Sequence, residues 1–128
     1  MIIKRNNNAE QKLVKSLSYK TISQQESSHI DVEQFKAFHD FLQEAFPLIH
    51  QYLKKEVIND LSLLFTWEGS ESSLKPAIFL AHQDVAPIAP GTEKDWEHPP
   101  FDGVIDDTFI WGRGTLDCKG FLDRKSVV

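Results

Sequence analysis

The sequence predicts an α/β fold, and three segments carry that prediction. Residues 31–45 have apolar side chains at helical spacing, residues 61–67 alternate between apolar and polar side chains as a strand does, and residues 77–81 form a short apolar run. Both periodicities occur in a chain of 128 residues with 41% hydrophobic content, which suffices for one packed core and is too short for two typical domains. We therefore expect residues 1–128 to belong to one domain.

Two helices are expected in the first part of the chain. Residues 9–18 predict the first, with one apolar face formed by Leu13, Val14 and Leu17. Asp31 is a good N-cap for the second, Gln34 stands where a capping box places its partner, and Pro47 should end this helix. The apolar stripe of the second helix comprises Phe35, Phe38, Phe41, Leu42 and Ala45.

Strands are expected in the second half of the chain. The first should place on one side the alternate residues Leu61, Leu63, Phe65 and Trp67. The turn formers of residues 68–76 should join it, as a hairpin, to a second strand at residues 77–81. A long proline-rich loop at residues 86–103 is expected to follow. The stretch VIDDTFIWGRG, residues 104–114, should form another hairpin, with Asp106 and Asp107 at the turn.

The charge balance excludes two classes of partner. The net charge is −5, with 14 basic and 19 acidic residues, so a sequence-independent grip on nucleic acid or on an anionic membrane is not expected. The first residues contain no apolar run long enough for a signal peptide, and no later segment is long enough for a membrane span. We therefore expect either a cytosolic protein or a targeting segment upstream of this chain. A single cysteine, Cys118, cannot form an internal disulfide.

An apolar run that leads into a histidine and an aspartate is the first candidate site. Because side chains alternate along a strand, His82 and Asp84 should point to the same side just beyond the carboxyl end of the run. A histidine there is a candidate metal ligand, and a neighbouring carboxylate can hold its ring in one tautomer. The pattern also fits an ordinary strand-end histidine, and it recurs at His29 and Asp31, where helix capping explains the aspartate better. The remaining histidines, expected to be solvated or to pack on neighbours, are His39, His50 and His98.

A second candidate lies in the segment WGRGTLDCKG, residues 111–120. Gly112 and Gly114 permit a sharp turn after the predicted strand, and Asp117 then stands where a loop meets the next element. One carboxylate with two oxygens can bridge two cations, as it does in two-metal hydrolases. The alternative is that Asp117 caps a helix. Cys118 is a poor candidate for a nucleophile, because the neighbouring aspartate disfavours a thiolate.

Three stretches together resemble the M20 family of zinc metallopeptidases. They are EVINDLSLLFTWEGS, LAHQDVAP and DWEHPPFDGVIDDTFIWGRGTLDCKG, and the resemblance runs from about Leu13 to Lys119. The likeness is to the carboxypeptidase S branch, which includes Gly-X carboxypeptidases and N-acyl amino acid hydrolases and synthases. It implies the N-terminal part of a dizinc exopeptidase catalytic domain, with a phosphorylase/hydrolase-like α/β fold that is incomplete in this chain.

The resemblance assigns roles to individual residues. It implies that His82 binds one of two zinc ions, that Asp84 has the catalytic role of orienting this histidine, and that Asp117 bridges both ions. The loop that supports the bridging carboxylate is matched by Gly112, Arg113 and Gly114. It also implies a cis peptide bond between Asp117 and Cys118, although most relatives have aspartate or asparagine at position 118. The loop that scaffolds the mouth of the site is expected to contain Trp96, Pro99 and Phe101.

The resemblance also implies an activity. The intact enzyme would hydrolyse the C-terminal peptide bond of short or N-blocked peptides, so the expected partner is a peptide or an N-acyl amino acid. An N-acyl amino acid amidase with the same metal chemistry and an inactive truncated product with at most a binding role remain open. The general base and the remaining metal ligands are expected outside this sequence, so the isolated chain of 128 residues is expected to be inactive. Residues 119–128 are expected to form a divergent or truncated tail. The branch is vacuolar or secreted, although this chain carries no signal peptide.

Overall fold

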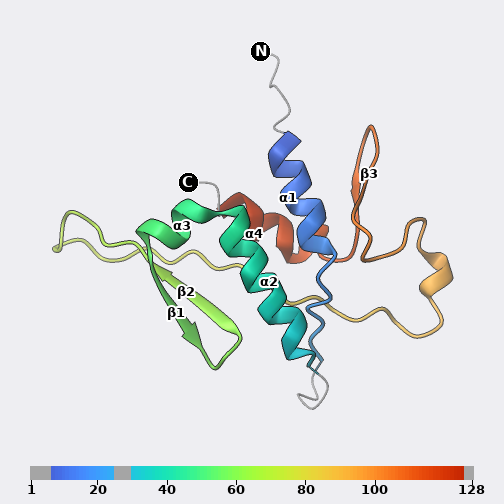
Figure 1. The fold of residues 1–128 in the computed structure, drawn as a ribbon, viewed down its shortest axis with the longest axis horizontal. Helices are drawn as coiled ribbons and strands as arrows, with labels where there is room; N and C mark the ends of the chain where they lie inside the picture. Colours follow the sequence, from blue (N-terminus) through green and yellow to red (C-terminus); the bar gives the residue numbers. More distant parts are fainter. Residues whose placement is uncertain (1–6, 25–29, 126–128) are drawn as a thin grey trace.

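The computed structural model describes residues 7–24 and 30–125 of the chain. In chain order the elements are α1 (Asn7–Leu17), α2 (Val32–Ala45), α3 (Pro47–Tyr52), β1 (Lys54–Ile58), β2 (Ser62–Thr66), η2 (Glu93–Asp95), β3 (Val104–Ile105), β4 (Ile110–Trp111), η3 (Thr115–Lys119) and α4 (Gly120–Lys125). Helices surround the centre, and two separate two-stranded sheets lie at its sides (Figure 1). The predicted combination of helices and strands is therefore confirmed. None of the described helices is long and apolar enough to cross a membrane.

Helix α2 begins where the sequence predicts. The side chain of Asp31 accepts hydrogen bonds from the backbone amides of Glu33 (3.2 Å) and Gln34 (3.3 Å), which confirms it as the N-cap. The other half of the expected capping box is absent, because Gln34 Oε1 accepts instead from the backbone amide of Lys20 (2.9 Å). Gln34 therefore ties α2 to the segment that follows α1. His29 lies outside the described residues.

The predicted stripe of α2 forms the main core. Phe38 is 0% exposed, and its ring centroid lies 5.6 Å from that of Tyr19 and 6.0 Å from that of Phe41. The buried cluster comprises Phe38, Phe41, Leu42, Phe46 and Ile49. Half-buried residues from β2 and α4 pack against it, among them Leu63, Phe65 and Leu122. Aromatic rings thus supply most of the buried area near the centre of the molecule.

Pro47 ends α2 as expected, whereas the expected partner of β2 is wrong. Pro47 also begins α3, because proline is well suited to the first turn of a helix. Strand β2 pairs antiparallel with β1 rather than with residues 77–81. Asn59 and Asp60, in the connection between β1 and β2, both have positive φ (48° and 65°), which these residue types tolerate and which tight hairpins favour. This short turn closes at a lower entropic cost than the nine-residue connection 68–76 would.

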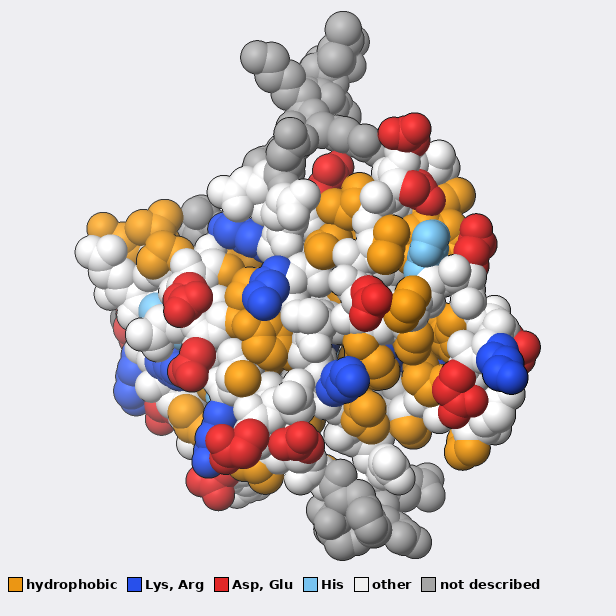
Figure 2. Space-filling model, turned by 45° about the vertical axis from the view of Figure 1, so that its right-hand side comes forward, with side chains coloured by type: hydrophobic (Ala, Val, Ile, Leu, Met, Phe, Trp, Pro, Cys, Tyr) orange, Lys and Arg blue, Asp and Glu red, His pale blue; other side chains and the backbone are white. Residues whose placement is uncertain are grey.

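The apolar run at residues 77–81 is extended, but neither of the two sheets in the described part of the chain includes it. It crosses the molecule from the side of the β1–β2 hairpin toward the side of α1 (Figure 1). The side chains of Ile78, Phe79 and Leu80 are 79%, 80% and 80% exposed. Hydrophobic side chains also reach the surface over much of the face shown in Figure 2. The expected second strand is therefore not formed here, because its apolar side chains have no sheet to pack into.

The second half of the chain follows the prediction more closely. The proline-rich segment contains only the short helical turn η2, and β3 pairs antiparallel with β4. Asp106 closes the hairpin turn, because one of its oxygens accepts from the backbone amides of Thr108 and Phe109, each at 2.7 Å. Its other oxygen accepts from the indole nitrogen of Trp111 (2.6 Å). The predicted hairpin is therefore confirmed, with its strands at residues 104–105 and 110–111.

Asp123 in α4 offers a stability test. Its side chain is 8% exposed, and its Oδ1 makes no hydrogen bond within the described part of the chain. Burial raises the pKa of this carboxyl above its ordinary value of 3.8, against the opposing effect of Lys12 on α1. The folded state therefore holds the Asp123 proton more tightly than the unfolded state, and the associated stability is lost as the pH rises above that value.

We expect Asp123→Asn to raise the free energy of unfolding at pH 7 by about 1 kcal/mol, because it removes a buried charge. Near pH 3, where the carboxyl is protonated in both states, the gain should vanish. Urea denaturation at the two pH values measures this difference. Asp40→Asn, on an exposed position of α2, is the control and should change little at either pH. An equal gain for Asp123→Asn at both pH values would contradict the explanation by charge burial.

Candidate metal centre

The backbone around His82 is held by the segment that follows α1. Val85 N donates to Thr21 O (2.8 Å) and Ser23 N donates to Val85 O (3.1 Å), which forms one parallel bridge between the two segments. The hydroxyl of Thr21 donates to the carbonyl of Gln83 (2.7 Å). These hydrogen bonds therefore attach the residues that directly follow the candidate ligand His82 to the segment after α1.

Gln83 anchors the same segment to α2. Its Oε1 lies 2.9 Å from Nε2 of His39, and its amide donates to the carbonyl of Leu61. His39 is 8% exposed, so of the two expected alternatives it is a packing residue and not a solvated one. Its ring can be buried on α2 because the Gln83 amide satisfies it.

His82 lies between two carboxylates. Its Nδ1 is 3.1 Å from Asp84 Oδ1 and 3.0 Å from Asp84 O, and its Nε2 is 2.8 Å from Asp117 Oδ1. The hydrogen bond with Asp117 is the largest cause that raises the pKa of His82 above its ordinary value of 6.5. The structure thus brings together three residues that the sequence singled out.

Asp117 is presented by the irregular helical turn η3. Its side chain is 90% exposed, and its carboxylate contacts His82 rather than the first turn of α4. The backbone angles of Asp117 (φ −122°, ψ 93°) lie outside the helical range. The peptide bond between Asp117 and Cys118 is cis, as the family resemblance implies. The geometry therefore favours a role for the Asp117 carboxylate in the candidate site over a role as a helix cap.

Two glycines allow the connection between β4 and η3 to approach its neighbours. Gly114 has φ +91°, and a Cβ at this position would lie 2.7 Å from Cγ1 of the buried Val85. A Cβ on Gly112 would lie 2.9 Å from Cδ1 of Leu17. The absent side chain of Gly114 matters most for the site, because Val85 directly follows Asp84 in the chain. This contact brings the two candidate segments together.

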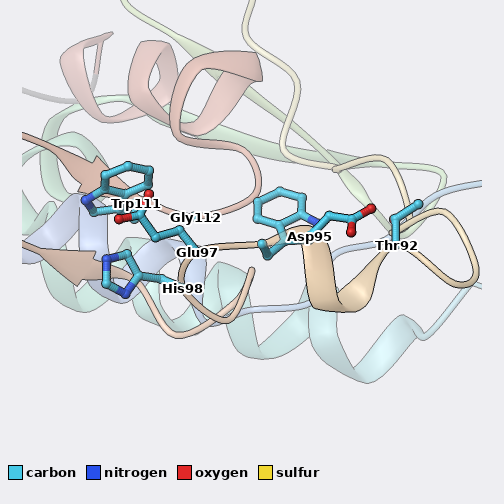
Figure 3. A pocket seen from close by; sticks show the side chains of 7 residues that line it. Thr92, Asp95, Glu97, His98, Trp111 and Gly112 are labelled. Carbon is cyan, nitrogen blue, oxygen red and sulfur yellow. The ribbon is translucent and has the colours of Figure 1, made fainter.

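Arg113 contacts the proline-rich loop through its side chain and its backbone. Its guanidinium carbon lies 5.1 Å from the ring centroid of Trp96, and its backbone amide donates to Pro100 O (2.6 Å). His98 packs edge-on against Trp111, with ring centroids 5.1 Å apart (Figure 3). An open hollow of about 370 Å³ lies in this loop, lined by Thr92, Asp95, Trp96, Glu97, His98, Trp111 and Gly112. Neither His82 nor Asp117 is among the residues that line this hollow.

Lys119 ties η3 to the end of α1. Its side chain is 1% exposed, and its Nζ donates to Ser16 O and to Tyr19 O, each at 2.8 Å. The ammonium also lies 4.7 Å from the ring centroid of Phe38. Burial lowers the pKa of Lys119 to about 7, while the two carbonyls stabilise its charged form. This side chain anchors the turn that carries Asp117 to the central core.

Sequence reasoning did not assign a role to Ser23 or Lys119. The hydroxyl of Ser23 donates to Asp84 Oδ2 across 61 positions of sequence, and Lys119 reaches Ser16 across 103 positions. Nothing in the polar neighbourhood of Ser23 predicts its contact. Lys119 lies in the segment 111–120, two positions after Asp117, and this position was the only available signal.

His82 and Asp117, called the His82 pair, offer atoms that suit a metal ion. An imidazole nitrogen and a carboxylate oxygen are both ligands that zinc accepts. Across residues 7–24 and 30–125, however, no three His, Cys, Asp or Glu side chains gather closely enough to hold a metal ion. The pair therefore fits zinc as part of a coordination shell and falls short of the three protein ligands of a catalytic zinc.

Comparisons with known proteins identify relatives over most of this chain. "Probable carboxypeptidase S-like 2" of Dictyostelium discoideum is 47% identical over 112 residues, which are 86% of this chain and 21% of that protein. "Carboxypeptidase S" of Saccharomyces cerevisiae is 49% identical over 90 residues, 69% of this chain and 16% of that protein. "N-fatty-acyl-amino acid synthase/hydrolase PM20D1" of Homo sapiens is 44% identical over 84 residues, 64% of this chain and 16% of that protein. No family model matches the chain.

The aligned region thus spans between 16% and 21% of the length of these relatives. Identities of 44% to 49% over 84 to 112 residues agree with the resemblance seen in the motifs around His82 and Asp117. The chain is a carboxypeptidase S-like member of the M20 family.

Proposed function

We propose that His82 and Asp117 belong to the dizinc centre of a carboxypeptidase that hydrolyses the C-terminal peptide bond of short or N-blocked peptides. The observation that carries this proposal is the 2.8 Å contact between His82 Nε2 and Asp117 Oδ1, made while Nδ1 of the same ring faces Asp84. The names of the relatives from Dictyostelium and yeast support peptidase chemistry. In this proposal the described fold is part of a dizinc exopeptidase catalytic domain.

Each of the three side chains has a distinct task at this site. Asp84 accepts the Nδ1 proton of His82, so the lone pair of the neutral ring is on Nε2 and faces Asp117. Asp117 offers a second oxygen and can reach two cations at once. Zinc, when bound, supplies the Lewis acid that polarises the scissile carbonyl and lets water attack near neutral pH. The general base is not among the residues assigned here.

Metal binding at this pair competes with protons. The Asp117 hydrogen bond raises the pKa of His82, so the protonated ring persists to a higher pH than in a free histidine. A protonated imidazole has no lone pair for a cation, and zinc affinity should therefore increase as the pH rises through that pKa.

An N-acyl amino acid amidase is the second candidate, supported by the 44% identity with the human N-fatty-acyl-amino acid synthase/hydrolase. Incubation of the zinc-loaded chain with N-acetyl-Gly-Leu and with N-oleoyl-leucine, with chromatography of the released leucine, separates the alternatives. Release from the dipeptide alone supports the carboxypeptidase, and release from the fatty-acyl substrate alone supports the amidase. Release from neither agrees with the expectation that this chain is inactive without the general base.

The metal itself is tested by a substitution at His82. We expect His82→Ala to weaken zinc binding at least about tenfold, because it removes the only nitrogen donor of the pair. Isothermal titration of the chain with zinc at pH 7.5 measures the affinity. His50→Ala is the matched control, since His50 packs on Phe65 (ring centroids 5.0 Å apart) and should leave the affinity within about twofold. Equal zinc affinities for His82→Ala and the wild type would exclude this site as the metal centre.

A further inference from the structure

Ser23 contacts the candidate site from a distant part of the chain. Its hydroxyl donates to Asp84 Oδ2, and its backbone amide donates to Val85 O (3.1 Å). The backbone bond places Ser23 beside Asp84 independently of the side chain. The hydroxyl is therefore free to act on the carboxylate alone.

The two oxygens of Asp84 have different partners. Oδ2 accepts from Ser23, and Oδ1 lies 3.1 Å from Nδ1 of His82. Without the contact from Ser23, the Asp84 carboxylate could rotate about its χ2 angle, because aspartate populates a broad and roughly two-fold range of χ2 values. With Oδ2 held, the direction of Oδ1 is set, and the Nδ1 proton of His82 has a defined acceptor.

We propose that Ser23 is a positioning residue that acts through Asp84 to set the tautomer and orientation of His82. The hydroxyl holds one carboxylate oxygen, the other oxygen accepts the Nδ1 proton, and the Nε2 lone pair is directed toward Asp117. The expected effect of Ser23 on zinc affinity rests on the proposed function. The expected effect on the tautomer and orientation of His82 concerns the metal-free chain and does not. Partners that orient a metal-binding histidine typically change metal affinity when removed.

The competing contact makes this positioning necessary. A neutral imidazole carries its proton on one of its two nitrogens. Asp117 Oδ1, 2.8 Å from Nε2, would hold this proton on Nε2, and Nε2 would then have no lone pair for a cation. Nδ1 also lies 3.0 Å from the backbone carbonyl of Asp84, which can accept the proton without fixing the carboxylate. The Asp84 carboxylate is a stronger acceptor for the Nδ1 proton than the neutral carbonyl, because a charged acceptor makes the stronger hydrogen bond. Asp117 is also a charged acceptor, so the Nδ1–H tautomer is favoured over the Nε2–H tautomer only if Asp84 Oδ1 is held in place and cannot rotate away from Nδ1.

The test compares the loss of two hydroxyls on one segment. Ser23→Ala should shift the tautomer of the neutral His82 ring from Nδ1–H toward Nε2–H, as read from the imidazole ¹⁵N shifts of the metal-free chain. It should also weaken zinc binding by about threefold to tenfold. Ser23→Thr, which keeps a hydroxyl, should restore both. Thr21→Val is the matched control, because the Thr21 hydroxyl supports the same segment but donates to the Gln83 carbonyl (2.7 Å).

Thr21→Val should lower the melting temperature while leaving the tautomer and the zinc affinity near the wild-type values. An unchanged tautomer in Ser23→Ala, or an equal loss of zinc affinity in Ser23→Ala and Thr21→Val, overturns the proposal. If the wild-type chain binds no zinc, the proposed function fails, whereas the tautomer measurement still decides the role of Ser23. The two failures are thus distinguishable.

Discussion

Phe38→Ala is expected to lower the free energy of unfolding by about 3–5 kcal/mol, the range for removing a fully buried phenylalanine. Phe38 is 0% exposed, and its ring lies against Tyr19 and Phe41. The ring also lies 4.7 Å from the Lys119 ammonium, which anchors the turn that carries Asp117. The substitution therefore opens a cavity where α2, the segment after α1 and η3 meet. Small domains have only about 5–15 kcal/mol of stability, so a large share would be lost.

Urea denaturation followed by circular dichroism measures this loss. Phe79→Ala is the matched control, because it removes the same side chain from a position that is 80% exposed. We expect this control to change the free energy of unfolding by less than about 0.5 kcal/mol. Similar effects of the two substitutions would show that the core does not lie around Phe38.

Gly114→Ala is expected to destabilise the fold by about 2–5 kcal/mol and to weaken zinc binding. The positive φ of +91° costs a residue with a Cβ about 1–2 kcal/mol. The added Cβ would also lie 2.7 Å from Val85 Cγ1, and the repacking of a buried contact of this kind costs about 1–3 kcal/mol. Because Val85 follows Asp84 and Gly114 precedes η3, the strain separates the segments that carry His82 and Asp117.

A second glycine separates the two costs. Gly91 has φ +87°, but no atom lies within 4 Å of the position that its Cβ would occupy. Gly91→Ala should therefore show only the backbone cost and leave zinc binding unchanged. Thermal denaturation and zinc titration of both variants provide the comparison. An equal loss of stability in the two variants would mean that close packing at Gly114 is not what holds the two segments together.

Local sequence patterns predicted the elements whose stabilising contacts are local. Asp31 caps α2 through its own side chain, and the β3–β4 hairpin is closed by Asp106 within three residues. The pairing of β2 was mispredicted because two turns were available, and the one at Asn59 and Asp60 is shorter. The burial of His39 could not be read from its helix, because the Gln83 side chain that satisfies it lies 44 positions away.

The sequence by itself identified the chemical groups of the candidate site. The motifs around His82, Asp84 and Asp117 indicated which side chains to consider, and the family resemblance suggested their roles. Only the tertiary structure decided that Nε2 of His82 lies 2.8 Å from Asp117 and that Ser23 and Lys119 hold the two segments in place. The physical reason is that these contacts join positions 35 to 103 residues apart, and no local periodicity encodes them. They form because burial of the aromatic core brings α1, α2 and η3 together.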